Sequence, residues 1–130
     1  WGGMLNDGAT SFYEEYDPAV TGIEKYAMYG DKFAKSLCHA WGSGPIAMLL
    51  KYVAGVRVKD GGKSFTVTPR PGKYKKFTAT VPVFGGAVKV IYDNGKITVI
   101  SNVSGGKLIV SGKTYKINEK SPVTAQFTEE

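Results

Sequence analysis

Apolar and polar residues alternate almost without interruption after Gly55, and short turn segments break the alternation at regular intervals. The clearest case is segment 88–100, where two alternating runs flank Asn94-Gly95. Asn-Gly suits the positive backbone angles of a two-residue type I′ turn, so this segment predicts a β-hairpin. A period of two places every second side chain on the same face of a strand. The pattern therefore restricts this half of the chain to half-buried β-strands.

The same signals continue to the end of the chain. Ser111-Gly112 separates two apolar runs and predicts a second hairpin over 108–117. About eight short strands with regular turn signals are typical of an antiparallel β-sandwich. We therefore expect a β-sandwich domain over 56–130. The other segments with strand character are 56–59, 65–67, 77–83 and 123–127.

Helical signals precede Gly55. The pattern predicts helix over 31–54, with Asp31 and Ser36 as candidate N-caps. Gly44-Pro45 gives a second start signal, since proline is tolerated in a first helical turn. Gly55 then gives a good C-terminal stop. We expect a helical first domain over 1–55.

The last part of this predicted helix has almost no polar face, and such helices are normally enclosed on several sides. A small sandwich offers few ways to enclose it, so partner helices are expected upstream. The chain also opens on Trp1-Gly2-Gly3-Met4, with no initiator methionine. Both features lead us to expect a fragment cut from a longer parent protein, and they leave the cellular compartment open.

Charge is unevenly distributed over the 130 residues, whose formal net charge is +6. Segment 1–55 holds four basic and six acidic residues, whereas 56–130 holds thirteen and five. A basic half raises the question of nucleic acid. Its lysines fall on strands and turns, as at Lys113 and Lys116, where protection of strand edges is the simpler explanation. We expect no nucleic-acid partner, and no apolar run is long enough to predict a membrane span.

Cys38 and His39 are the single cysteine and the single histidine of the chain. A lone cysteine excludes an internal disulfide framework and favours a buried thiol that packs as a small hydrophobe. One Cys and one His are too few ligands for a structural zinc site. We expect neither a metal nor an organic cofactor.

Three acids, Glu14, Glu15 and Asp17, lie within four positions and are interleaved with aromatic residues. Carboxylates and aromatic faces bind sugars, and hydrolysis of a glycosidic bond requires a pair of carboxyl groups. In an inverting enzyme, one acid protonates the leaving oxygen while the other, ionised, takes a proton from the attacking water. The alternative is an acidic helix start followed by a loop, favoured by the helix dipole.

Two segments carry a resemblance to a known family. Gly8-Ala9-Thr10-Ser11-Phe12-Tyr13-Glu14 resembles the Gly-Ala-Thr-Thr-x-Trp-Glu signature of the bacterial α-L-rhamnosidases of glycoside hydrolase family 78, in the six-hairpin glycosidase superfamily. Ser36-Leu37-Cys38-His39-Ala40-Trp41-Gly42-Ser43 is similar to the Ser-x-Asn-His-x-x-x-Gly segment that follows it there. That family continues through a final barrel helix into a β-sandwich. The resemblance covers the chain in order.

The resemblance implies an α+β fragment, in which the terminal helices of an (α/α)6 barrel precede an antiparallel β-sandwich. It implies an inverting α-L-rhamnosidase that releases terminal rhamnose from plant or bacterial glycans. Glu14 takes the position of the general base, and His39 takes that of a sugar-lining histidine. Tyr13, Asp17 and Trp41 are candidate neighbours in the sugar subsite. No residue matches the general acid, so the fragment is expected to be inactive alone.

Departures from the family pattern leave the sugar open. Tyr13 and Ser11 stand where tryptophan and threonine are usual, and Cys38 replaces the asparagine before the histidine. His39 and Trp41 also have a plainer explanation as core residues. Trp1, Tyr26 and Tyr29 either line the cleft or anchor loops.

Two other functions compete with the enzyme fragment. A free-standing carbohydrate-binding module needs exposed aromatics on one sandwich face, and it leaves the Gly-Ala-Thr segment unexplained. An interaction domain would use the apolar helix to hold a partner or to dimerise, because a large exposed apolar patch invites association. In each case the bacterial compartment, whether periplasmic, secreted or cytoplasmic, stays open.

Overall fold

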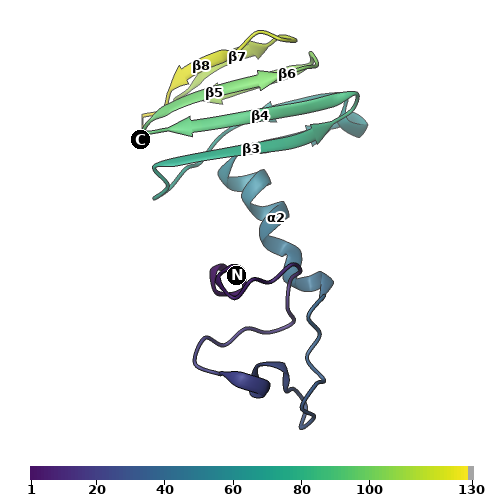
Figure 1. Ribbon diagram of the computed structural model, residues 1–130. Helices are drawn as coiled ribbons and strands as arrows, with labels where there is room; N and C mark the ends of the chain where they lie inside the picture. Colours follow the sequence, from purple (N-terminus) through teal and green to yellow (C-terminus); the bar gives the residue numbers. More distant parts are fainter. Residues whose placement is uncertain (129–130) are drawn as a thin grey trace. The chain divides into compact units, whose positions relative to one another are not determined.

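The computed structural model describes residues 1–128, which form two compact units that divide after Ala47. Eight strands make up most of the second unit and lie in two sheets of four (Figure 1). The first sheet has the order β1-β2-β6-β7, and the second has the order β3-β4-β5-β8. The strands are β1 (Val56–Lys59), β2 (Ser64–Val67), β3 (Lys76–Val83), β4 (Gly86–Asp93), β5 (Lys96–Ser101), β6 (Gly106–Val110), β7 (Lys113–Ile117) and β8 (Val123–Gln126). The predicted set of strands is confirmed.

Both predicted hairpins are present. Strands β4 and β5 pair antiparallel around Asn94 and Gly95, whose φ angles are 45° and 89°. Strands β6 and β7 pair around Ser111 and Gly112, with φ angles of 46° and 71°. Positive φ at both central residues is the requirement of a type I′ turn.

One strand pair departs from the prediction of an antiparallel sandwich. Strands β2 and β6 run parallel, with Phe65 opposite Gly106. After β2, the chain forms β3, β4 and β5 of the other sheet. It then re-enters the first sheet as β6, which runs in the same direction as β2. Gly106 is required there, because a Cβ atom would lie 2.1 Å from the Phe65 ring.

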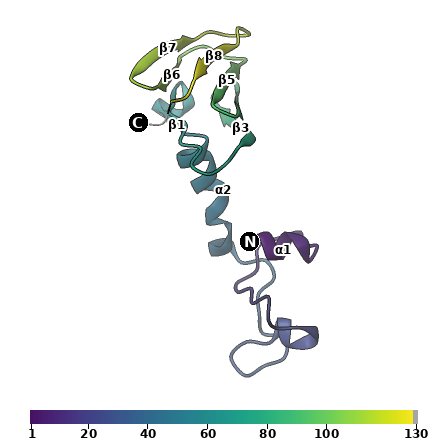
Figure 2. The same cartoon turned by 90° about the vertical axis from the view of Figure 1, so that its left-hand side faces the viewer.

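The core lies between the two sheets, which Figure 2 shows from a second direction. The inward side chains come from alternate positions of each strand, as the period of two predicts. Burial of each of these side chains stabilises the fold by about 1.5–3 kcal/mol. The fully buried members include Phe65, Val67, Leu108 and Ile117 of one sheet and Val88, Val90, Ile97 and Val99 of the other.

The predicted helix over 31–54 is wrong in its first part. Asp31 pairs with Met28 in a tight turn, and its carboxylate accepts a hydrogen bond from the Phe33 backbone N–H. Ser36 donates its own backbone N–H to Glu14, so neither candidate acts as an N-cap. The helical elements are α1 (Gly2–Asn6), a 3₁₀ turn at Gly22–Tyr26, a second at Ala40–Ser43, α2 (Gly44–Met48) and a π-helical turn at Leu49–Val53.

The later helix signals are confirmed. Pro45 lies in the first turn of α2. Gly55, at φ 74°, lies just past the last helical turn, and a Cβ atom there would meet the Thr68 carbonyl. No helix among residues 1–128 has both the length and the apolar character needed to span a membrane.

The first unit has almost no core of its own. Within 1–47, Met4 is the one large apolar side chain that is buried. Trp41 is 92% exposed, and Tyr29, Leu5 and Phe33 are also exposed. Most of the large apolar side chains of this unit are therefore exposed or only partly buried.

Candidate functional site

The two segments that carry the family resemblance lie side by side in the first unit. The Phe12 carbonyl accepts a hydrogen bond of 2.7 Å from the His39 N–H. The Glu14 N–H donates to the Ser36 carbonyl at 2.8 Å. The Ser11 hydroxyl also donates to the Leu37 carbonyl. Backbone pairing therefore fixes Glu14 and His39 in one local framework.

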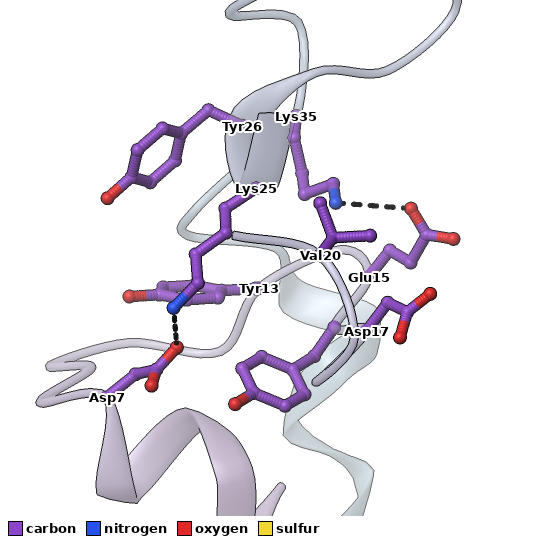
Figure 3. Close-up of a pocket in the computed structure, with 9 residues that line it drawn as sticks. Asp7, Tyr13, Glu15, Asp17, Val20, Lys25, Tyr26 and Lys35 are labelled. Atoms are coloured by element: carbon purple, nitrogen blue, oxygen red, sulfur yellow. Dashed lines mark hydrogen bonds and ion pairs between the residues drawn. The ribbon is translucent and has the colours of Figure 1, made fainter. Parts of the chain in front are cut away.

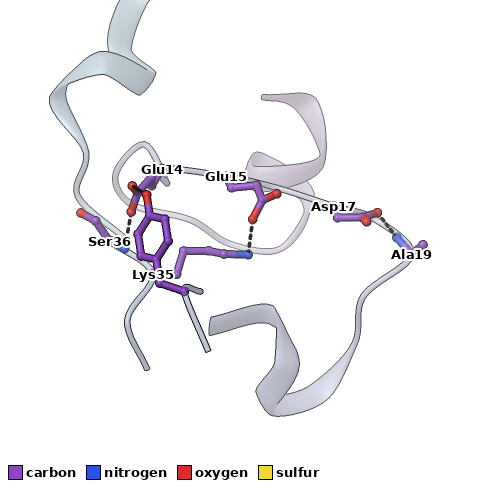
Figure 4. Close-up of polar contacts among 7 residues, drawn as sticks. Glu14, Glu15, Asp17, Ala19, Lys35 and Ser36 are labelled. Atoms are coloured by element: carbon purple, nitrogen blue, oxygen red, sulfur yellow. Dashed lines mark hydrogen bonds and ion pairs between the residues drawn. The ribbon is translucent and has the colours of Figure 1, made fainter. Parts of the chain in front are cut away.

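The Glu14 carboxylate is held by two donors (Figure 4). The Tyr29 hydroxyl donates to Oε1 at 3.1 Å, and the Ser36 backbone N–H donates to Oε2 at 3.2 Å. The Ser36 N–H, followed by the Tyr29 hydroxyl and the nearby His39 and Lys35, lowers the pKa of Glu14. Glu14 is therefore ionised at neutral pH, as a proton acceptor must be.

Glu14 lines an open hollow of about 980 Å³. Tyr13, His39, Trp41 and Tyr29 line the same hollow. The His39 and Trp41 rings meet edge to face, with their centroids 6.3 Å apart. Because Trp41 is exposed and His39 is half-buried, neither is a core residue of the first unit. Four of the five predicted site residues thus come together.

Trp1 forms part of the same hollow. Its indole Nε1–H donates to the Gly42 carbonyl at 2.8 Å, which anchors the ring. Gly42 also lies against Phe12, where a Cβ atom would come within 2.9 Å. A ring held at the rim of an open hollow offers an apolar face to a ligand.

Asp17, the fifth predicted residue, lies elsewhere. It lines a smaller pocket of about 140 Å³ with Glu15 and Lys35 (Figure 3). Its carboxylate accepts the Ala19 N–H at 2.9 Å, which is a local turn contact. Tyr13 borders this pocket as well as the larger hollow.

Two ion pairs lie in the lining of the smaller pocket. Lys35 Nζ lies 3.2 Å from Glu15 Oε2, and only 5% of the Lys35 side chain is exposed. Lys25 Nζ lies 2.6 Å from Asp7 Oδ2, which lowers the pKa of Asp7 and raises the pKa of Lys25. The Glu15 side chain therefore points to Lys35, away from the Glu14 contacts (Figure 4).

Sequence reasoning missed the donors to Glu14 and misplaced Cys38. The Ser36 N–H lies 22 positions from Glu14, a separation at which spacing carries no signal. Tyr29 was considered as a cleft residue, but nothing in the sequence pointed to its bond with Glu14. The prediction of a buried Cys38 thiol is wrong, because Cys38 lies in an exposed loop rather than on a helix.

A second acid, Glu15, also lines the hollow, but its carboxylate is paired with Lys35. Within 1–128, no three His, Cys, Asp or Glu side chains gather as metal ligands would. In the first unit, Asp7 and Glu15 form ion pairs, while Asp17 and Asp31 accept backbone N–H groups. Glu14 is therefore the acid placed to act on a ligand in this hollow.

Loss of the Tyr29 hydroxyl should raise the pKa of Glu14. In Tyr29→Phe, one of the two donors that favour the ionised carboxylate is gone, so the titration midpoint of Glu14 moves to higher pH. The carboxyl ¹³C shift of Glu14 against pH measures this directly. Tyr26→Phe removes a hydroxyl that makes no bond to Glu14 and should leave the midpoint in place. A midpoint that is unmoved in Tyr29→Phe would contradict the hydrogen bond.

Comparison with known proteins does not assign the chain to a family. No model of a known protein family matches the chain, and no curated protein matches it in sequence. Among solved structures, it is similar to a protein from the human microbiome provisionally assigned as a kojibiose phosphorylase, at 16% sequence identity and a TM-score of 0.43. That similarity covers 60% of this chain and 10% of the other protein. A likeness of this size carries no argument about family or activity.

Proposed function

We propose that the chain is the C-terminal part of an inverting glycoside hydrolase, with an α-L-rhamnoside as substrate and Glu14 as general base. The observation that carries the proposal is the arrangement in the first unit. An ionised carboxylate held by two donors shares an open hollow with a histidine and exposed aromatic rings. The choice of rhamnose rests on the resemblance of the Gly8–Glu14 and Ser36–Ser43 segments.

The geometry suits a base. Each Glu14 oxygen accepts one hydrogen bond from the protein, and a carboxylate oxygen accepts two. One lone pair on each oxygen is thus free to accept a proton from water. In an inverting mechanism, the water attacks the anomeric carbon as Glu14 takes its proton, while an acid on the opposite side protonates the leaving oxygen.

The remaining groups bind the sugar. His39 offers ring nitrogens to sugar hydroxyls, and Trp41 and Tyr13 offer apolar faces to the ring. The general acid would come from an earlier segment of the parent enzyme, since the other acids near the hollow have local partners. The proposed chemistry uses carboxyl groups alone and requires no cofactor.

The exposed apolar surface fits the same proposal. Met4 is the one large apolar side chain of 1–47 that is buried. A single buried side chain is too little apolar burial to stabilise a unit of this size. Upstream barrel helices would cover Phe33, Leu5 and the neighbouring apolar groups. An interaction domain that holds a partner or dimerises through the apolar helix is the alternative, and the exposed Ile46 and Met48 of α2 are the observation in its favour.

The first test is hydrolysis of an aryl α-L-rhamnoside by the full-length protein, followed by ¹H NMR. We expect release of rhamnose whose first-formed anomer is inverted relative to the substrate. Retention would exclude the inverting mechanism and Glu14 as its general base, because a retaining enzyme first forms a covalent glycosyl-enzyme intermediate. Absence of rhamnose release, with a full-length chain that dimerises through 1–55, would favour the interaction domain.

A further inference from the structure

We propose that the outer face of the sheet β1-β2-β6-β7 binds an acidic polysaccharide, one that carries carboxylate or sulfate groups along its chain. This face lies in the second unit and shares no residue with the Glu14 hollow. The inference goes beyond the proposed function and does not depend on it.

A row of polar side chains crosses the whole sheet. In register, Arg57 lies opposite Thr66, Thr66 opposite Lys107, and Lys107 opposite Lys116. Most of their neighbours along the strands are buried in the core, namely Val56, Phe65, Val67, Leu108 and Ile117. Since side chains alternate between faces, the row points outward. Neighbouring strands are about 4.8 Å apart, so the row places three cations, Arg57, Lys107 and Lys116, across the width of one sheet.

A shallow pocket of about 200 Å³ continues this row beyond β1. Its cations are Lys51, Arg57, Lys59 and Arg70. Thr66 and Thr68 contribute hydroxyl groups, and Tyr52 contributes an aromatic ring. Lys51 Nζ and Arg57 Cζ lie 5.4 and 5.9 Å from the centre of that ring. The pocket thus combines an aromatic surface, hydroxyl groups and fixed positive charge.

Within residues 1–128, no carboxylate pairs with these cations. The four strands contain no acidic residue, and within 1–128 none of the six cations forms an ion pair. The nearest acid along the chain, Asp60, accepts a hydrogen bond from the Ser64 hydroxyl. On the second sheet, by contrast, Lys76 is paired with Asp93 at 3.2 Å.

Protection of strand edges does not explain the whole pattern. Strands β1 and β7 are the edges of this sheet, and lysines there would discourage pairing with other chains. Strand β6 is internal, yet Lys107 stands at its outer face beside Thr66 of the other internal strand. A positive row that continues across internal strands fits a ligand of opposite charge.

The groups on this face favour a polysaccharide over nucleic acid. Single-stranded nucleic acids are held by successive aromatic platforms, one for each of several bases. Tyr52 is the single aromatic ring in the pocket. The Thr66 hydroxyl instead lies between Arg57 and Lys107, and Thr68 adds a second hydroxyl group in the pocket, which suits hydrogen bonding to sugar hydroxyls beside charged groups.

The test measures binding of the full-length protein to four probes by isothermal titration calorimetry. The probes are an oligogalacturonate, a sulfated dextran, a neutral galactan and a single-stranded oligodeoxynucleotide. We expect binding to at least one acidic polysaccharide, none to galactan, and a steep loss of affinity with added salt. The carboxylated and sulfated probes distinguish the two anionic groups.

A matched pair of substitutions locates the site. Lys107 and Lys89 are both exposed and lie on internal strands of opposite sheets, β6 and β4. Lys107→Glu should weaken polysaccharide binding by roughly tenfold, whereas Lys89→Glu should weaken it less than about twofold. Equal losses in both variants, tighter binding of the oligodeoxynucleotide, or no binding of either acidic polysaccharide would each overturn the proposal.

Discussion

Glu14→Gln should lower kcat of the full-length enzyme on an aryl α-L-rhamnoside by roughly 10²- to 10⁴-fold, with little change in substrate affinity. The substitution keeps the size of the side chain. Its one amide oxygen can accept the Ser36 N–H, and its NH2 group can donate to the Tyr29 hydroxyl oxygen, which accepts as well as donates. The amide cannot take a proton from water, so the water attacks without general-base assistance. Initial rates and the binding of rhamnose to the variant measure the two effects separately.

Glu24→Gln is the matched control, because Glu24 is exposed in the 3₁₀ turn Gly22–Tyr26 and forms no ion pair within the described part of the chain. It should retain full activity. Azide is a nucleophile that requires no deprotonation, so it should restore turnover of the Glu14 variant and give a glycosyl azide of inverted configuration. A Glu14 variant with undiminished kcat would remove Glu14 from the mechanism.

The sandwich could be predicted because its signals are local. Alternation over five to eight residues assigns a face to each side chain, and Asn94-Gly95 fixes the register of one hairpin. The parallel pairing of β2 and β6 could not be predicted, since it depends on where the chain returns after β5. At that junction, Gly106 makes room for the Phe65 ring. It is the one residue there whose type indicates a close contact between neighbouring strands.

The first unit was harder to predict for a physical reason. Asp31 and Ser36 have good capping side chains, and local rules alone predict helices after them. In the structure, their backbone groups pair with Met28 and Glu14 instead, and Lys35 turns inward to Glu15. The contacts with Glu14 and Glu15 join segments about twenty residues apart. The resemblance to a known family brought the two segments into one site, whereas periodicity and spacing did not.

The two units also differ in what stabilises them. The second unit has a continuous core that both sheets contribute to, with Val88, Val90 and Ile97 fully buried. The first is held by backbone pairing, two ion pairs and the Trp1 bond to Gly42. Of the two ion pairs, the partly exposed Lys25–Asp7 pair contributes little to stability. Substitutions with large effects on stability are therefore expected in the sandwich, and Phe65 is the strongest candidate.

Phe65→Ala should destabilise the sandwich by about 3–5 kcal/mol, since it removes a fully buried ring and leaves a cavity between β2 and β6. Phe84→Ala is the control with the same chemical change. The Phe84 ring is 65% exposed, so its loss should cost less than about 1 kcal/mol. Amide hydrogen exchange of β4 and β5 in the full-length protein reports the opening of the sandwich alone. Exchange in the Phe65 variant should be faster by roughly two to three orders of magnitude. Equal protection in the two variants would show that the Phe65 ring does not support the core.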